Sequence, residues 1–250
     1  MPCKSGSQNI KEQRDYMNKI NNKFDKVVCI NLLSRPDKKE HMQKKFDKLG
    51  IEVEWFHAVP YGFAGEVVNS LKPTVNDFPR FNVKHPNEFG AAMSHYTVIK
   101  TALLQGYKNI FVFEDDAMFR KQFESAFDIY YDKLPEDWNM IMLYSFMYKL
   151  QDQNLIVNSK WIKSFDAWSL MAYGMNKKAM ETYISEQDKF FSIADRVSFK
   201  MQGKDLNIYS TVPTLCIPNQ KLGSNIRGDN MNYINTNTVL NLGFSNSNYE

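Results

Sequence analysis

Three consecutive carboxylates end an apolar run near the middle of the chain. Glu114, Asp115 and Asp116 directly follow the sequence Phe-Val-Phe at 111–113. Adjacent carboxylates at the end of a buried strand repel one another and lose hydration unless a cation compensates for their charge. Mg²⁺ and Mn²⁺ bind oxygen ligands, and typically combine one or two carboxylates with the phosphate groups of a substrate. The three acids therefore predict a divalent metal that holds a phosphate ligand.

The same residues have a second interpretation, which the local sequence leaves open. They could form a solvated acidic turn before the next helix, because aspartate is favoured at helix N-termini. If the extended conformation continues through the turn, alternation points Glu114 and Asp116 to one side and Asp115 to the other. Which of Glu114 and Asp115 assists Asp116 is open as well.

The segments before the acids have the pattern of an α/β sheet. We predict a strand at 27–32, a helix at 37–49 that ends at Gly50, and a strand at 51–58. A strand, a helix and a strand within about 30 residues indicate a right-handed crossover between parallel strands. Ligands of such sheets bind outside the carboxyl ends of the strands, which is where the acids lie.

The remaining segments extend this pattern into one domain. They are an irregular segment at 59–84, a helix at 86–105, a strand at 109–114, a helix at 120–133, a strand at 138–144, a hairpin at 147–163, a strand at 169–175, helices at 177–187 and 192–200, and a strand at 207–212. We expect an α/β domain over residues 26–217, with a tail or short helix at 1–25 and a flexible segment at 218–250.

Composition and charge narrow the choice of partners and compartment. The formal net charge of the 250 residues is +3 and the basic residues are dispersed, so no nucleic acid partner is expected. The three cysteines lack metal-ligand spacing and fit a reducing compartment. No transmembrane segment or signal peptide is visible, which predicts a cytoplasmic protein, in the host cytoplasm if the source is a virus. The helix at 37–49 is expected to carry a solvated basic face formed by Lys38, Lys39, Lys44, Lys45 and Lys48.

Motifs of several other enzyme classes are absent from the sequence. There is no Gly-x-Gly-x-x-Gly or P-loop motif, no Gly-x-Ser-x-Gly elbow and no His-Glu-x-x-His helix. Without a glycine loop, a metal and a cationic side chain must hold any phosphate. Arg35, just after the first strand, could pair with a diphosphate or with a surface acid.

Three motifs, in this order, resemble those of the family 25 glycosyltransferases, which include lipooligosaccharide and collagen galactosyltransferases and relatives in large DNA viruses. They are Ile30-Asn31-Leu32 with Arg35-Pro36, the block 88–95 and the block 113–119. The resemblance implies a GT-A fold with a Rossmann-like, mostly parallel central sheet flanked by helices. It also implies an enzyme that uses Mn²⁺ or Mg²⁺ to move a hexose, galactose or glucose, from a UDP-sugar to a glycan or glycoprotein acceptor.

The resemblance further implies roles for single residues. Asp116 is the expected principal metal ligand, with Glu114 or Asp115 sharing the metal or the ribose hydroxyls. For an inverting transfer, Asp195 is the first choice and Asp166 the second for the base that deprotonates the acceptor hydroxyl. Because no histidine follows the acids, Asn219, Asn225 or Asp229 would complete the metal shell. The expected donor contacts are Asn31, Leu32, Arg35, Glu88, Ser94 and His95.

Each of these interpretations has an alternative. His95 shares a helical stripe with apolar residues and could be a buried core histidine. Asp195 could cap its own short helix. A metal-dependent nucleotidyltransferase or phosphohydrolase, or a glycan-binding module that has lost catalysis, are the alternative functions. The oligomeric state does not follow from the sequence.

Overall fold

The computed structural model describes residues 19–60, 86–147, 153–165, 167–189, 192–223 and 248–250. Its helices are α2 (Lys19–Lys23), α3 (Pro36–Leu49), α5 (Pro86–Leu104), α6 (Phe123–Tyr131), α7 (Lys177–Lys189) and α8 (Ala194–Met201), with 3-10 turns at Gln153–Leu155 and Gln220–Leu222. Its strands are β1 (Lys26–Asn31), β2 (Glu54–His57), β3 (Asn109–Glu114), β4 (Ala117–Phe119), β5 (Met140–Met142), β6 (Phe146–Met147), β7 (Trp161–Lys163), β8 (Ala167–Trp168), β9 (Ala172–Asn176), β10 (Ile208–Thr211) and β11 (Cys216–Pro218).

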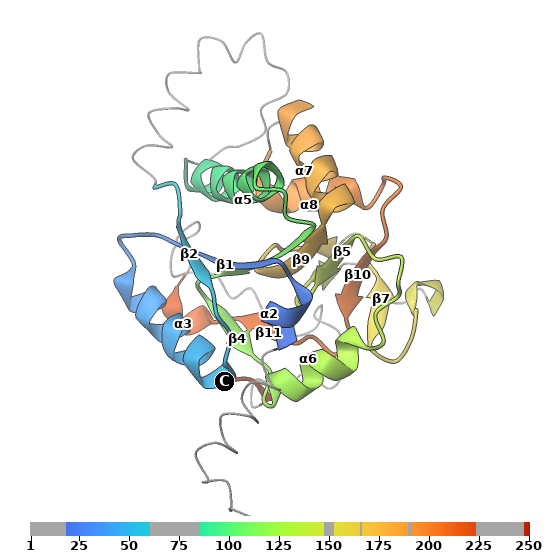
Figure 1. The fold of residues 1–250 in the computed structure, drawn as a ribbon, viewed down its shortest axis with the longest axis horizontal. Coiled ribbons are helices and arrows are strands. Elements are labelled where there is room, and N and C mark those ends of the chain that lie inside the picture. Colours follow the sequence, from blue (N-terminus) through green and yellow to red (C-terminus); the bar gives the residue numbers. More distant parts are fainter. Residues whose placement is uncertain (1–18, 61–85, 148–152, 166, 190–191, 224–247) are drawn as a thin grey trace, which may run out of the picture.

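A seven-stranded sheet in the order β2-β1-β3-β9-β5-β10-β7 forms the centre of the domain (Figure 1). β1 is parallel to both β2 and β3, and β5 is parallel to β10. β9 lies between β3 and β5 and is antiparallel to both, and β7 is antiparallel to β10. Five strands therefore run in one direction and two in the other. The predicted α/β class with a mostly parallel central sheet is confirmed.

Helices cover both faces of the sheet and enclose two apolar cores. α5, α7 and α8 cover one face, where Val112, Tyr173 and Val197 are among the buried residues (Figure 1). α3 and α6 cover the other face, where the rings of Phe111 and Phe113 lie 4.7 Å apart. Because apolar burial on both faces holds each strand in register, the carboxyl ends of the strands occupy defined positions.

The first strand, helix and strand follow the predicted pattern. Pro36 begins α3 because its fixed φ suits the first helical turn. Gly50 ends the helix in the left-handed conformation, with φ of 65°, which glycine adopts without steric penalty. β1 and β3 have nearly the predicted bounds, while β2 and β5 are shorter than the runs at 51–58 and 138–144. These elements bring the acids to the edge where β1 and β3 end.

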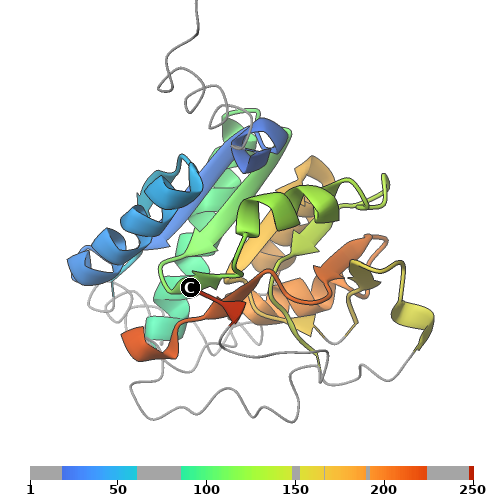
Figure 2. The same cartoon turned by 90° about the horizontal axis from the view of Figure 1, so that it is seen from below.

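A small second sheet follows the acids, where the sequence predicted only a helix. β4 pairs with β11, and Pro218 lies opposite Ala117. The chain near Tyr249 runs along β4, since the amide of Phe119 donates to the carbonyl of Glu250 at 3.1 Å (Figure 2). The predicted helix at 120–133 is shortened to α6 as a result. Residues 248–250 thus pack against the domain.

Other predicted segments differ or fall outside the described residues. The prediction of a hairpin at 147–163 is wrong in its main strand pairing, because β7 pairs with β10. Within this segment, Ile156 and Ile162 form an isolated bridge. Most of 59–84 and of the segment beyond Leu222 lie outside the described residues. The domain boundaries at 26 and 217 stay a prediction. Within the described ranges, no helix combines the length and apolarity needed to span a membrane.

Candidate active site

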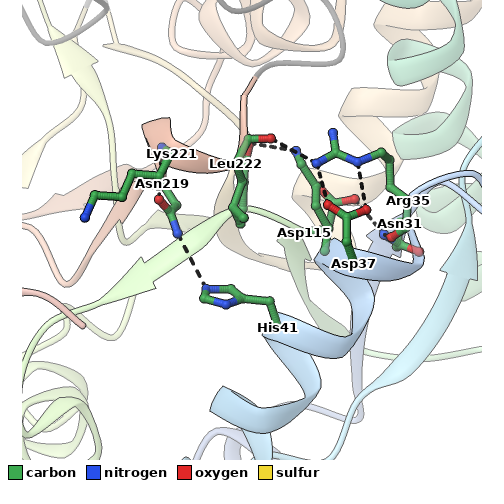
Figure 3. A network of polar contacts seen from close by, with 10 residues as sticks. Asn31, Arg35, Asp37, His41, Asp115, Asn219, Lys221 and Leu222 are labelled. Atoms are coloured by element: carbon green, nitrogen blue, oxygen red, sulfur yellow. Dashed lines mark hydrogen bonds and ion pairs between the residues drawn. The ribbon is translucent and has the colours of Figure 1, made fainter.

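The acids form the turn that leaves the central sheet. β3 ends at Glu114, and Asp115 and Asp116 connect it to β4. The neighbouring parallel strand β1 ends at Asn31. The amide Nδ2 of Asn31 donates to Oδ2 of Asp115 at 2.7 Å and to the carbonyl of Arg35 at 3.1 Å (Figure 3). Asn31, predicted as a donor contact, therefore fixes the orientation of Asp115.

Lys38 is buried against the acids, so the predicted solvated lysine face is wrong at this position. Its Nζ lies 3.2 Å from Oδ1 of Asp115 and 3.6 Å from Oδ2 of Asp116, and its side chain is 1% exposed. α3 begins five residues after β1, so its first turn lies over the strand end. The signal was present in the sequence, because Lys38 falls on the same helical stripe as Met42 and Phe46.

Burial and mutual repulsion dominate the electrostatics of the acidic turn. Burial, with the charge of Glu114, raises the pKa of Asp116 to about 7 although Lys38 opposes the shift. Burial also raises the pKa of Asp115, against the opposing effects of Lys38 and Asn31. Beneath the turn, burial and the three acids raise the pKa of the Cys29 thiol. The site therefore gains stability from added positive charge.

Glu114 contacts His95 of α5, which covers the opposite face of the sheet from α3. Nε2 of His95 lies 3.0 Å from Oε1 of Glu114, and Nδ1 lies 2.9 Å from the hydroxyl of Tyr173. His95 is buried on α5, and Tyr173 is buried on β9. His95 is thus both a core histidine and a partner of an acid. Tyr173 was not predicted as a site residue, and its spacing in the sequence carries no signal for this contact.

Asp195 lies on the same side of the sheet as His95. It is in the first turn of α8, one residue after the helix starts, so it does not occupy the cap position. Together with burial, its charge raises the pKa of Tyr144 to about 12. Burial and Tyr183 are the largest causes of the raised pKa of Tyr173, and the charges of Glu114 and Asp195 raise this pKa further. The structure therefore places both carboxylates within electrostatic range of one tyrosine, whereas Asp166 lies outside the described residues.

Arg35 is held by protein groups. Its guanidinium donates to both carboxylate oxygens of Asp37, at 2.9 and 2.7 Å, and to the carbonyl of Leu222 at 3.0 Å (Figure 3). Its backbone amide donates to the carbonyl of Leu32 at 2.9 Å. These contacts agree with the predicted alternative of an ion pair with a surface acid, and they connect the β1–α3 turn to the segment after β11.

Ser94 has a structural position inside the domain. Its hydroxyl donates to the carbonyl of Gly90 at 2.7 Å and accepts from the amide of Val59 at 2.9 Å. Ser94 is fully buried, so in this conformation it supports the connection after β2. Glu88 lies in the first turn of α5. The donor roles predicted for these two residues stay predictions.

The carboxylates suit a hard divalent cation that brings further oxygen ligands with it. Among the described residues, no group of three or more His, Cys, Asp or Glu side chains is placed to hold a metal. The side chains of Glu114 and Asp116 are partly exposed, at 37% and 22%. Mg²⁺ and Mn²⁺ need only one or two carboxylates when phosphates supply other ligands. The backbone amide of Asn219 donates to the carbonyl of Asp116 at 2.7 Å, while 225 and 229 lie outside the described residues.

The chain thus has a mostly parallel sheet with carboxylates at the carboxyl end of a central strand, which is the edge at which α/β proteins bind their ligands. The sequence profile described as glycosyltransferase family 25 (LPS biosynthesis protein) matches residues 24–187. The chain belongs to glycosyltransferase family 25. The matched region contains the acids, His95 and Tyr173, and it ends before Asp195.

Individual relatives are similar over less than half of this chain. A Drosophila melanogaster glycosyltransferase 25 family member is 30% identical over 106 residues, 40% of this chain and 17% of that protein. Human procollagen galactosyltransferase 2 is 27% identical over 132 residues, which are 48% of this chain and 20% of that protein. Human inactive glycosyltransferase 25 family member 3 is 28% identical over 134 residues, which are 48% of this chain and 22% of that protein. The matched region thus spans about a fifth of the length of these relatives.

Proposed function

We propose that this chain transfers a hexose from a nucleoside diphosphate sugar to a hydroxyl group of a glycan or protein, with the help of a divalent metal. Membership of glycosyltransferase family 25 supports glycosyl transfer. The observation that carries the proposal is the acidic turn, in which Asn31 and Lys38 hold Asp115 while the side chain of Asp116 is partly exposed. This turn lies where α/β sheets bind their ligands.

Asp116 is the proposed principal metal ligand, with Glu114 or Asp115 as the second. Mn²⁺ or Mg²⁺ bound there would stabilise the charge that develops on the departing diphosphate. Asp115 has both oxygens engaged by the protein, which fixes the turn. Glu114 is oriented by His95. The resemblance to galactosyltransferases favours UDP-galactose or UDP-glucose as the donor.

Asp195 is the proposed base on the acceptor side. An acceptor hydroxyl is a weak nucleophile at neutral pH, and a carboxylate within hydrogen-bond reach removes its proton during attack. Asp195 suits this role because its charge acts on Tyr144 and on Tyr173, the tyrosine on which Glu114 acts as well. Tyr144, with a pKa of about 12, stays protonated and is available as a hydrogen-bond donor near Asp195. One such base on the far side of the sugar corresponds to an inverting transfer.

The test is a panel of UDP-, GDP- and TDP-sugars with purified protein and Mn²⁺. Donor binding is measured by thermal shift, because a ligand of the folded state raises the apparent stability. Nucleotide release is measured in parallel. We expect a UDP-hexose to bind and turn over only with the metal, and Asp116→Ala to lose both. The matched control is Asp205→Ala, which removes an exposed aspartate paired only with Lys178 in the described part of the chain. No response to any sugar, together with unchanged nucleotide affinity in Asp116→Ala, would refute the proposal.

A second candidate is a glycan-binding module without catalysis. A relative named inactive is among the similar proteins, so membership of the family does not by itself establish turnover. This function predicts that an acceptor glycan binds equally well with and without donor and metal, and that no nucleotide is released. Metal-dependent release of UDP by the wild-type protein would exclude it.

A further inference from the structure

Lys38 is a buried cation to which the proposed transfer assigns no role beyond its contact with Asp115. Its side chain is 1% exposed, although four other lysines lie on the same helix. An ammonium group in the protein interior is unfavourable unless it is paired and hydrogen-bonded. Its partners are Asp115 and Asp116, which belong to the site itself.

Lys38 supplies positive charge at the point where the acids need it. Nζ lies between Oδ1 of Asp115, at 3.2 Å, and Oδ2 of Asp116, at 3.6 Å. The other oxygen of Asp115 accepts from Asn31 at 2.7 Å. The two aspartates are thus joined through one ammonium group, and the turn has an internal substitute for part of the charge of a metal.

We propose that Lys38 is a positioning residue that acts as an internal counter-cation. It holds the Asp115–Asp116 turn in place without a metal, and it selects for a metal that arrives bound to a diphosphate. The first role depends only on the contacts of Lys38, whereas the second rests on the proposed function for the identity of the anion.

The selection follows from charge. A free divalent cation at Asp116 is repelled by the ammonium of Lys38, which has already neutralised part of the acidic turn. A metal that carries a nucleoside diphosphate brings negative charge with it, so the same ammonium then attracts the complex. Lys38 therefore weakens binding of the free ion and strengthens binding of the metal with its nucleotide.

The experiment compares Lys38→Met with Lys44→Met in the full chain. Lys44 lies on the same helix, its side chain is 73% exposed and it pairs with Glu40, so its loss changes the net charge equally without affecting the turn. Calorimetric titrations use MnCl₂ alone and then UDP in the presence of saturating Mn²⁺. Melting temperatures are recorded in EDTA and in Mn²⁺.

We expect Lys38→Met to bind Mn²⁺ alone about tenfold more tightly than wild type, the factor that corresponds to one pK unit of electrostatic interaction. It should bind UDP with Mn²⁺ more weakly, and it should melt lower in EDTA, with a larger stabilisation by Mn²⁺. Lys44→Met should match wild type in each measurement. Equal or weaker binding of Mn²⁺ by Lys38→Met, relative to Lys44→Met, would overturn the proposed role of Lys38 as a counter-cation.

A second variant covers the case in which Lys38→Met does not fold. The double variant Lys38→Met with Asp115→Asn removes one charge of each sign, and it should recover folding if Lys38 neutralises the turn. Failure of both variants to fold would overturn the proposal.

If the Mn²⁺ ranking holds but the wild type binds no UDP or UDP-sugar, the proposed function fails and the structural role of Lys38 stands. If sugar transfer is observed while Lys38→Met behaves as Lys44→Met, the proposed role of Lys38 fails and the proposed function stands.

Discussion

The hydroxyl of Tyr173 lies 2.9 Å from Nδ1 of His95, on the opposite side of the ring from Glu114. If the tyrosine donates to Nδ1, the proton of a neutral imidazole lies on Nε2, which then donates to the Glu114 carboxylate. Tyr173 thereby selects the tautomer that orients an acid of the site. A residue of β9 thus acts on the end of β3 through a side chain of α5.

Tyr173→Phe should impair donor use as well as folding. Loss of one buried hydrogen bond lowers the free energy of unfolding by about 1 kcal/mol. Because Glu114 is no longer held by a single tautomer, we expect the KM for the donor to rise by roughly two- to tenfold, about 0.4 to 1.4 kcal/mol of binding. Tyr183→Phe is the control, since that buried hydroxyl contacts Gln187 at 3.4 Å. Equal kinetics for the two variants would remove the proposed link.

Asp116→Asn should stabilise the metal-free protein above neutral pH. The pKa of Asp116 is about 7 in the folded state, against an ordinary value of 3.8. The folded state therefore binds more protons than the unfolded state between pH 4 and 7, and the contribution of Asp116 to stability falls as pH rises through that window. Asparagine removes this loss, which we expect to raise the unfolding free energy at pH 8 by on the order of 1 kcal/mol or more.

The measurement is the melting temperature in EDTA at pH 5 and pH 8. The difference between Asp116→Asn and wild type should be about 2–4 °C for each kcal/mol at pH 8 and smaller at pH 5. Asp205→Asn, an exposed aspartate, should show no such dependence. A difference that grows toward low pH would have the wrong sign.

Asp195→Asn should slow turnover without weakening donor binding. Removal of a general base lowers kcat by about 10²- to 10⁴-fold. The thermal shift with UDP-sugar and Mn²⁺ should stay as in wild type, because the donor side of the site is unchanged. Asp166→Asn tests the second choice in the same assay. A normal kcat in Asp195→Asn with a large loss in Asp166→Asn would reverse the assignment.

Gly174→Ala should destabilise the domain through steric overlap at the middle of β9. A Cβ at Gly174 would lie 2.7 Å from the ring of Phe24 and 3.0 Å from Ile141. Overpacking of this kind lowers stability by about 1–3 kcal/mol. Gly203→Ala is the matched control, because its nearest neighbour would be at an ordinary 3.5 Å. Chemical denaturation that gives equal stabilities for both variants would contradict the packing of Phe24 on β9.

Elements whose signals lie between near neighbours in the chain could be predicted from the amino-acid sequence. The apolar runs of β1 and β3 and the glycine at position 50 that ends α3 are local features, and the structure has them where they were predicted. The acids at the carboxyl end of β3 follow from the same run. Local patterns are sufficient here because helix ends and strand ends depend on adjacent residues.

Which distant residues meet at those acids depends on how the whole chain packs. The antiparallel insertion of β9, the pairing of β4 with β11, and the contacts of Lys38 and Tyr173 join segments that are far apart in the chain. The pairing partners of a strand, and the side chains that a buried lysine meets, depend on packing over the whole sheet rather than on spacing. For that reason the acidic turn was visible in the sequence, whereas the contacts that hold its charge and orient its side chains became visible only in the fold.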